Sequence, residues 1–232
     1  MIDIIIISGW GDDGSLWENT INEFSSSYKT HFIDINIEGN FEKQLEKVNN
    51  YIDDKKIIKP IILAWSMGSI LAIRLASKVD ISALVLIGAT GSFVKRKEKG
   101  SSWSKKDVEI MKNNLLRNKN KQMRNFMKLS GAYGDILKDY ADLKTVEELI
   151  SGLDVLIDTN VIQDAKKIKC STLLIHGEKD KIVPLEKGKE LSSIIEGSKL
   201  IIYENCGHIP FWDEEERFIF DLVDFISNLN KE

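Results

Sequence analysis

The sequence predicts an α/β fold with a mostly parallel, doubly wound sheet of about six strands and one helical insertion. Short apolar runs recur along the chain, and they are nearly continuous rather than alternating, as in strands covered on both faces. Segments with helical periodicity separate most of these runs. Strands that alternate with helices form βαβ units, which build a parallel sheet with helices on both faces.

The predicted strands are short runs rich in isoleucine, leucine and valine, the residues expected in buried parallel strands. They occupy residues 2–7, 31–35, 60–65, 83–88, 171–176 and 199–203.

Two of the intervening helices have a clear apolar face. The face of the first is formed by Phe41, Leu45, Val48 and Ile52. The last helix is expected to begin at Asp213 and Glu216, which resemble a capping box. Its apolar positions are Phe218, Leu222 and Phe225.

The alternation of strands and helices stops once, in a long segment where no run predicts a strand. Its helical signals begin at a Ser104–Asp107 pair and continue over residues 123–129 and 145–157. The chain therefore divides into an α/β core, residues 1–90 and 168–232, and a helical cap, residues 91–167.

The composition is that of a globular protein, because 43% of the 232 residues are hydrophobic and 29% are charged. No apolar run approaches the roughly 18 residues that a membrane helix needs, and the N-terminus predicts a core strand rather than a signal peptide. Two cysteines are too few for a disulfide framework, so we expect a cytoplasmic protein. The three histidines show no metal-ligand spacing with cysteine, and we expect a monomer with no metal, cofactor or membrane contact.

Charge is distributed unevenly along the chain. The formal net charge is −4, yet residues 95–128 carry twelve basic and three acidic residues, which gives +9 and leaves −13 for the rest. A basic segment within an acidic protein requires an explanation. Nucleic acid is disfavoured as the partner, because aromatic residues that would stack on bases are sparse there.

Ser66 lies where a predicted strand ends and a helix begins, in the stretch AWSMGS. A nucleophile elbow is built this way, and its tight turn requires small residues two positions before and after the serine. Ala64 and Gly68 meet this requirement. The usual pattern has glycine at both positions, so Ala64 departs from it by one methyl group. For this short motif alone, a serine that caps the following helix is the alternative.

A serine nucleophile needs a base, and the base needs an acid that orients it. Asp180 follows the fifth predicted strand, and His208 lies between the last strand and the last helix. The three residues lie beyond carboxyl ends of strands, where sites form in open α/β sheets, and occur in the order serine, acid, histidine. Singly, Asp180 could be a turn residue and His208 a surface histidine; together they predict a triad. His31 and His176 are expected to be structural.

The loop SGWGDDGSLW after the first strand is a candidate oxyanion loop. An oxyanion hole needs two backbone N–H groups, and we expect them from Met67 and Trp10, whose indole would wall the acyl pocket. The glycines of the loop allow close approach of the backbone to a substrate. A phosphate-binding loop is the alternative, but the segment lacks both G-x-G-x-x-G and a P-loop lysine.

These motifs resemble those of the α/β-hydrolase superfamily. Within it, GWG…LW, WSMG, HGEKDKIVP and GHIPF resemble the BioH-type pimeloyl-[acyl-carrier protein] methyl ester esterases of biotin synthesis. The resemblance extends from Ile4 to about Phe225. It implies the α/β-hydrolase fold, a cofactor-free serine esterase, and a cap helix, RNFMKLSG, that lines an acyl channel. The channel residues implied are Trp10, Phe126, Met127, Leu129 and Ser130, whereas Trp103, Phe211 and Trp212 contribute to either the channel or the core.

The chain departs from the family pattern at three points. Ala64 and Ser69 stand where glycine is common, and the N-terminal strands usual in the family are missing or nearly so. None of these departures touches the predicted triad.

The resemblance also gives the basic segment a partner, because acyl-carrier proteins are small and acidic. Complementary charge would steer the carrier to the cap and orient it. The alternative is a solvated helix face, which explains any single lysine. The candidate docking residues are Lys112, Arg117, Lys119, Lys121, Arg124 and Lys128.

The implied reaction is hydrolysis of the methyl ester of a pimeloyl group through an acyl-enzyme. Other reactions of the superfamily remain open: a general carboxylesterase, a carbon–carbon bond hydrolase, or a lyase like that of menaquinone synthesis. A dehalogenase is disfavoured, because it needs a carboxylate in place of Ser66. Two non-enzymatic alternatives are a ligand receptor on the same fold and a carrier-binding module with vestigial chemistry.

Overall fold

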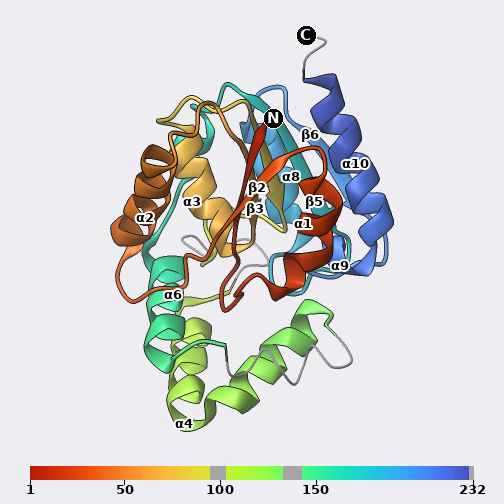
Figure 1. Ribbon diagram of the computed structural model, residues 1–232. Coiled ribbons are helices and arrows are strands. Elements are labelled where there is room, and N and C mark those ends of the chain that lie inside the picture. The colour runs from red at the N-terminus through yellow and green to blue at the C-terminus, as the bar shows by residue number, and fades with distance from the viewer. Residues whose placement is uncertain (95–102, 133–142, 230–232) are drawn as a thin grey trace.

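A parallel six-stranded sheet in the order β2-β1-β3-β4-β5-β6 forms the centre of the molecule (Figure 1). The computed structural model describes residues 1–94, 103–132 and 143–229. The strands are β1 (Asp3–Ile7), β2 (Lys29–Ile33), β3 (Ile61–Trp65), β4 (Ala83–Ile87), β5 (Ser171–Gly177) and β6 (Lys199–Tyr203). The predicted fold class, a doubly wound parallel sheet with a helical insertion, is confirmed.

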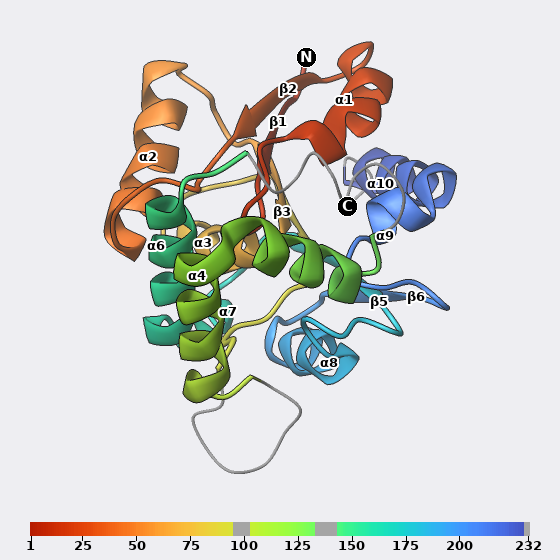
Figure 2. The same cartoon turned by 90° about the horizontal axis from the view of Figure 1, so that it is seen from below.

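Helices cover both faces of the sheet. Figure 2 shows α2, α3 and α8 on one side and α1 and α10 on the other. The helices of the core are η1 (Ser15–Trp17), α1 (Glu18–Ser25), α2 (Phe41–Asp54), α3 (Met67–Ala76), α8 (Leu185–Ile194), α9 (Pro210–Asp213) and α10 (Glu215–Asn228). Between β4 and β5 lie α4 (Lys105–Ser130), α6 (Val146–Asp158) and α7 (Ile162–Ala165).

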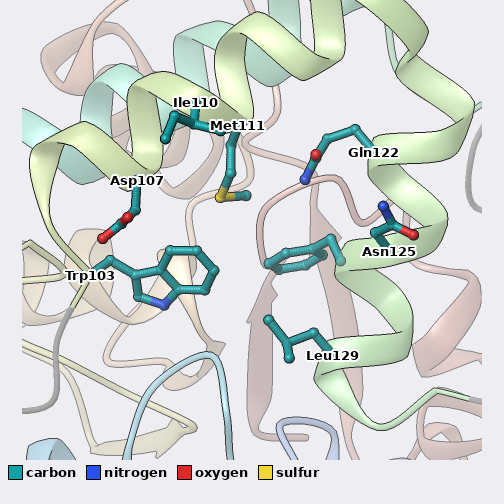
Figure 3. A pocket seen from close by; sticks show the side chains of 8 residues that line it. Trp103, Asp107, Ile110, Met111, Gln122, Asn125 and Leu129 are labelled. Atoms are coloured by element: carbon teal, nitrogen blue, oxygen red, sulfur yellow. The ribbon is translucent and has the colours of Figure 1, made fainter.

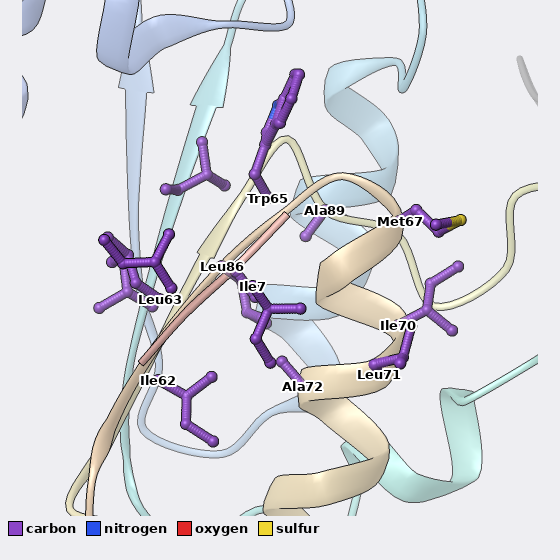
Figure 4. Close-up of a cluster of buried hydrophobic side chains, with 14 of the residues drawn as sticks. Ile7, Ile62, Leu63, Trp65, Met67, Ile70, Leu71, Ala72, Leu86 and Ala89 are labelled. Atoms are coloured by element: carbon purple, nitrogen blue, oxygen red, sulfur yellow. The ribbon is translucent and has the colours of Figure 1, made fainter. Parts of the chain in front are cut away.

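The core is densest around the central strands, because every residue of β3 and β4 is buried. Figure 4 shows Ile7, Ile62 and Leu86 of three adjacent strands among residues of α3, such as Ile70 and Leu71. Burial on both faces explains why these strands are continuous apolar runs. This rigid layer fixes the strand ends at which the candidate site lies.

The second strand begins and ends two residues earlier than the sequence pattern predicts. It covers Lys29–Ile33 rather than 31–35, because it pairs in parallel register with β1 and Ile33 lies opposite Ile7, the last residue of that strand. Beyond Ile33 the chain turns toward the loop after β1, where the backbone N–H of Ile35 donates to Ser8 Oγ at 3.1 Å. The predicted strand had included this turn.

The capping box predicted for the last helix is wrong. Pro210 begins the short helix α9, because proline is preorganised for a first helical position, and α10 then starts at Glu215 with no side-chain cap. Asp213 Oδ2 accepts a hydrogen bond from the backbone N–H of Gly207 at 3.3 Å instead. Its carboxylate therefore belongs to the loop that carries His208.

Two helices of the insertion, residues 91–167, form in the regions that the sequence predicts, α4 and α6, whereas the short helix α7 was not predicted. Ser104 and Asp107 make a capping box at the start of α4, and Thr145 and Glu148 make another at the start of α6. Asn118 has non-helical backbone angles and divides α4 into two arms, visible in Figure 2. Its side chain accepts from the backbone N–H of Lys121 at 3.0 Å and so caps the second arm.

Across the described ranges, no helix is long and apolar enough to cross a membrane.

The central strands should dominate stability. Replacing Leu86, which is fully buried on β4, by alanine leaves a cavity and should lower the free energy of unfolding by about 2–5 kcal/mol. The matched variant Leu116→Ala, at a position 67% exposed on α4, should stay within about 0.5 kcal/mol of wild type. Urea unfolding measures both values, and similar losses for the two variants would contradict this account of the core.

Candidate active site

Ser66 lies at a strained turn between β3 and α3. Its φ of 53° and ψ of −118° are unfavourable for a residue with a side chain. The turn brings α3 against the end of β1, so that a Cβ at Gly68 would lie 2.5 Å from the Ser8 carbonyl oxygen. Glycine is therefore required at position 68. Ala64, by contrast, is accommodated within the buried strand.

The structure brings Ser66, His208 and Asp180 into one hydrogen-bonded chain. His208 Nε2 lies 2.8 Å from Ser66 Oγ, and His208 Nδ1 lies 2.6 Å from Asp180 Oδ2. With Asp180 ionised, Nδ1–H donates to the carboxylate and leaves Nε2 free to accept from the serine hydroxyl. A chain of this geometry can transfer the serine proton to the imidazole while the carboxylate stabilises the imidazolium that forms.

Asp180 is held by its own loop. Its Oδ1 accepts from the backbone N–H groups of Ile182 and Val183, each at 2.8 Å, which leaves Oδ2 directed at His208. His176 lies beside it, with Nε2 donating to the Val183 carbonyl oxygen at 2.8 Å. Burial lowers the pKa of His176, which favours a neutral ring. His31 lies on β2, at the edge of the sheet, and hydrogen-bonds Asp3 and Tyr51.

The His208 loop is positioned by residues that the sequence analysis missed. Trp65 Nε1 donates to the His208 carbonyl oxygen, and the His208 N–H donates to the Ser130 carbonyl oxygen, each at 2.9 Å. At Gly88 a Cβ would lie 3.0 Å from two atoms of the imidazole, and the φ of +52° also favours glycine. Gly88 could have been found from the sequence, because it ends a predicted strand. No sequence feature marked Trp65.

The two candidate oxyanion residues lie on adjacent segments of backbone, since Gly68 packs directly against the end of β1. In the part of the chain that the structure describes, no acceptor pairs with the backbone N–H of Trp10 or Met67. Their side chains meet at Gly152 of α6, where a Cβ would lie 2.5 Å from Trp10 Cδ1 and 3.3 Å from Met67 Sδ. Trp10 Nε1 also donates to the Leu149 carbonyl oxygen of α6 at 2.8 Å.

The loop after β1 contains a buried carboxyl group. Asp12 accepts from the Gly14 backbone N–H and from Trp17 Nε1, both at 3.0 Å. Burial nevertheless raises the pKa of Asp12 to about 7, because these two bonds offset only part of its desolvation. The loop that carries Trp10 therefore contains a group that titrates near neutral pH.

A pocket of about 210 Å³ opens between the two arms of α4 (Figure 3). Phe126 lines it and also meets the Trp10 ring edge-to-face, with centroids 4.7 Å apart. The pocket is thus next to the candidate oxyanion loop. The residues that line it are Trp103, Asp107, Ile110, Met111, Gln122, Asn125, Phe126 and Leu129.

Of the predicted channel residues, Trp10, Phe126 and Leu129 adjoin or line this pocket, whereas Met127 and Ser130 do not line it. Met127 is fully buried. Ser130 Oγ donates to the Phe126 carbonyl oxygen within α4. Trp103 lines the pocket, whereas Phe211 stacks on Trp17 in the core.

The predicted docking residues fall into two groups. Lys112 pairs with Asp154 of α6 at 2.8 Å, a hydrogen bond that raises its pKa, and Lys119 Nζ donates to the Lys144 carbonyl oxygen at 3.0 Å. These two lysines hold the insertion together. The other four side chains are exposed. Arg117 precedes the kink at Asn118, and the remaining three follow helical spacing on the second arm: Lys121, Arg124 and Lys128. Residues 95–102 of the basic segment lie outside the described residues.

No group of three or more His, Cys, Asp or Glu side chains within the described ranges could hold a metal ion.

The sequence matches the alpha/beta hydrolase family over residues 4–221, so the chain belongs to this family. It is similar over nearly its whole length to proteins named pimeloyl-[acyl-carrier protein] methyl ester esterase. The protein of Nitrosospira multiformis is 26% identical, with 96% of this chain and 94% of the relative covered. That of Nitrosomonas europaea is 24% identical, with 94% and 92% covered. The family resemblance seen in the sequence is confirmed.

Solved structures support the same fold. An esterase from Exiguobacterium antarcticum superimposes with a TM-score of 0.91 at 22% identity, covering 98% of this chain and 92% of that one. An enol-lactonase from Burkholderia xenovorans gives a TM-score of 0.83 at 18% identity, with the same coverage. Their names differ in chemistry, so the likeness establishes the fold alone.

The raised pKa of Asp12 predicts a pH-dependent stability. The unfolded chain releases this proton near the ordinary pKa of 3.8, whereas the folded protein holds it to about pH 7. Between these values the folded state binds more protons, so the contribution of Asp12 to stability falls as pH rises. From pH 4 to 8, wild type should lose on the order of a few kcal/mol relative to Asp12→Asn. The free energy of unfolding in urea, measured for wild type and Asp12→Asn across this pH range, tests the prediction. The same pH dependence in both proteins would contradict it.

Proposed function

We propose that the protein is a serine carboxylesterase whose nucleophile, base and orienting acid are Ser66, His208 and Asp180. The observation that carries this proposal is the pair of short hydrogen bonds that links the three residues at a strained strand-to-helix turn. Membership of the alpha/beta hydrolase family and similarity to proteins named as esterases support it. The buried, fixed carboxylate is what an imidazole base requires in order to present Nε2 to the serine.

The proposed reaction uses these three residues and the two candidate oxyanion groups. His208 removes the proton of Ser66 as the oxygen attacks the ester carbonyl, and the backbone N–H groups of Trp10 and Met67 stabilise the oxyanion. The tetrahedral intermediate collapses, the alcohol leaves with the proton from His208, and an acyl group remains on Ser66. Water, deprotonated by His208, then attacks the acyl-enzyme and releases the acid and the free serine.

We propose the methyl ester of a pimeloyl group on an acyl-carrier protein as the substrate, with methanol as the alcohol released. The printed names of the similar proteins support this substrate. In this proposal residues 91–167 act as a cap, and the pocket between the arms of α4 receives the acyl chain. Phe126 favours this assignment, because it lies between that pocket and Trp10.

The carrier would dock on the exposed face of α4. Arg117, Lys121, Arg124 and Lys128 present four positive charges there, and no acidic side chain of the described residues pairs with them. Complementary charge would raise the association rate and orient an acidic partner. Lys112 and Lys119 are left out of this surface because they bind groups within the insertion. A cytoplasmic location and a monomeric state stay predictions.

Hydrolysis of methyl pimeloyl-carrier protein and of free dimethyl pimelate, compared at low and high salt, tests the proposed function. We expect a preference for the carrier-borne ester that falls as salt screens the docking charges. Ser66→Ala should reduce both reactions by at least about 10³-fold. Turnover that survives Ser66→Ala would contradict the triad. Equal, salt-independent turnover of the two esters would leave a general carboxylesterase, and tight binding without turnover would indicate a ligand receptor.

Charge reversal on α4 separates docking from chemistry. Lys121→Glu with Arg124→Glu should raise KM for the carrier-borne ester about tenfold, equivalent to about 1.4 kcal/mol, while hydrolysis of the free ester stays unchanged. The matched control, Lys167→Glu with Lys189→Glu, alters two exposed lysines away from α4 and should alter neither. Equal effects of the two pairs on KM would exclude α4 as the docking surface.

A further inference from the structure

Asn36 is a buried polar residue that the proposed chemistry does not use. It follows β2, and only 1% of its surface is exposed. Burying an amide is unfavourable unless its donors and acceptor are paired. All of its side-chain partners belong to the loop after β1 or to Asp34, which precedes it by two residues.

The side chain of Asn36 binds both sides of Trp10. Its Oδ1 accepts from the backbone N–H of Gly11 at 2.8 Å. Its Nδ2 donates to the carbonyl oxygens of Gly9 and Asp12, each at 2.9 Å. A flipped amide would set donor against donor and oxygen against oxygen, so this orientation is the one that satisfies the loop.

Because peptide units are planar, these contacts also determine how the backbone of the candidate oxyanion loop is oriented. The carbonyl of Gly9 and the N–H of Trp10 belong to one planar trans peptide unit, so they point in opposite directions. When Asn36 fixes the Gly9 carbonyl, it fixes the direction of the Trp10 N–H as well. The next peptide unit is fixed through the N–H of Gly11. Two glycines flank Trp10 and add to the rotational freedom that such contacts restrict. The Gly9 carbonyl oxygen also accepts from the Asp12 backbone N–H, at a longer 3.4 Å.

We infer that Asn36 is a positioning residue that sets the direction of the Trp10 N–H in the oxyanion hole. This inference rests on the proposed function, because it assigns a task to Asn36 only if Trp10 stabilises an oxyanion. Asn36 touches no reacting atom and acts through the backbone of the loop. Its contribution therefore belongs to the transition state, where negative charge develops on the carbonyl oxygen.

The insertion supports the same arrangement. Asp34 accepts from the Asn36 backbone N–H at 2.8 Å and forms an ion pair with the buried Lys144. A continuous set of contacts therefore runs from the segment before α6, through Asp34 and Asn36, to the peptide units around Trp10. The indole of Trp10, bound to the Leu149 carbonyl oxygen, holds the loop to the insertion from the other side.

Kinetics of Asn36→Ala and Asn36→Asp, measured on the full chain with a free methyl ester, test the inference. Asn36→Asp keeps the acceptor for Gly11 and the shape of the side chain but loses both donors to the carbonyls. Both variants should lower kcat about 10- to 100-fold and leave KM within about threefold, because removing one oxyanion donor outright lowers kcat by about 10²–10³. A trifluoromethyl ketone, which forms a tetrahedral adduct with serine, should lose affinity by the same factor as kcat.

Asn40→Ala is the matched control. Asn40 lies in the same crossover and caps α2 by accepting from the Lys43 N–H at 3.1 Å, but its side chain makes no described contact with the loop after β1. The variant Asn40→Ala should lower the melting temperature of the protein while leaving kcat within about twofold of wild type. The inference would be overturned if the Asn36 variants matched this control in kcat. It would also be overturned if they raised KM and the inhibitor constant of the product acid by the same factor as they lowered kcat.

The outcomes separate this inference from the proposed function. A wild-type protein without Ser66-dependent ester hydrolysis would overturn both. Wild-type turnover that Asn36→Ala and Asn36→Asp leave intact would overturn the inference alone. If one of the two variants fails to fold, kcat of the other still decides. In Asn36→Ala, which removes the acceptor of the Gly11 N–H, amide hydrogen exchange at Gly11 provides a readout without substrate. Faster exchange is expected, and unchanged exchange would show that Asn36 does not hold the loop.

Discussion

The approach of α3 to the end of β1 is the constraint on which the site depends. Gly68 lies so close to the carbonyls of Ile7 and Ser8 that no side chain fits there. This contact accompanies the strained backbone conformation of Ser66 and brings the backbone next to Met67 against the residues that precede the loop of Trp10. The strain is sustained because β3 and its neighbours are buried on both faces and cannot yield without losing packing. One close contact thus places a candidate nucleophile and two candidate oxyanion residues together.

The insertion is hydrogen-bonded to three of the loops that build the candidate site. The Leu149 carbonyl binds the Trp10 indole, the Ser130 carbonyl binds the His208 N–H, and Trp103 Nε1 donates to the Ile182 carbonyl oxygen beside Asp180 at 2.8 Å. A segment that only covered the site would not need hydrogen bonds to these three loops. The insertion therefore helps to fix the proposed catalytic groups as well as to form the pocket. Substitutions in α4 or α6 can affect the chemistry through these contacts.

Local signals in the sequence predicted the sheet, two helices of the insertion, and the serine, acid and histidine. Each depends on a short pattern: an apolar run, a capping pair, or a polar residue just after a strand. The errors arose where a neighbouring element decides the outcome. Pairing with β1 set the ends of β2, and Pro210 started a helix before the expected capping box.

Residues whose partners are distant in sequence could not be found in this way. Trp65 and His208 are 143 positions apart, Asn36 and Gly9 are 27 apart, and Lys112 and Asp154 are 42 apart. Nothing in the sequence around Asn36 indicates a buried amide, and a lysine paired with another helix looks the same as a free one. Only the folded chain separates the lysines that hold the insertion together from those that remain exposed.

The most direct test of the central claim is capture of the acyl-enzyme. The protein would be mixed with excess methyl ester, quenched in acid within milliseconds, and analysed by intact and peptide mass spectrometry. The account predicts an added acyl mass, with loss of methanol, on the peptide that contains Ser66 and on no other. Hydrolysis that proceeds with the acyl group on another residue, or an adduct that persists in Ser66→Ala, would contradict it.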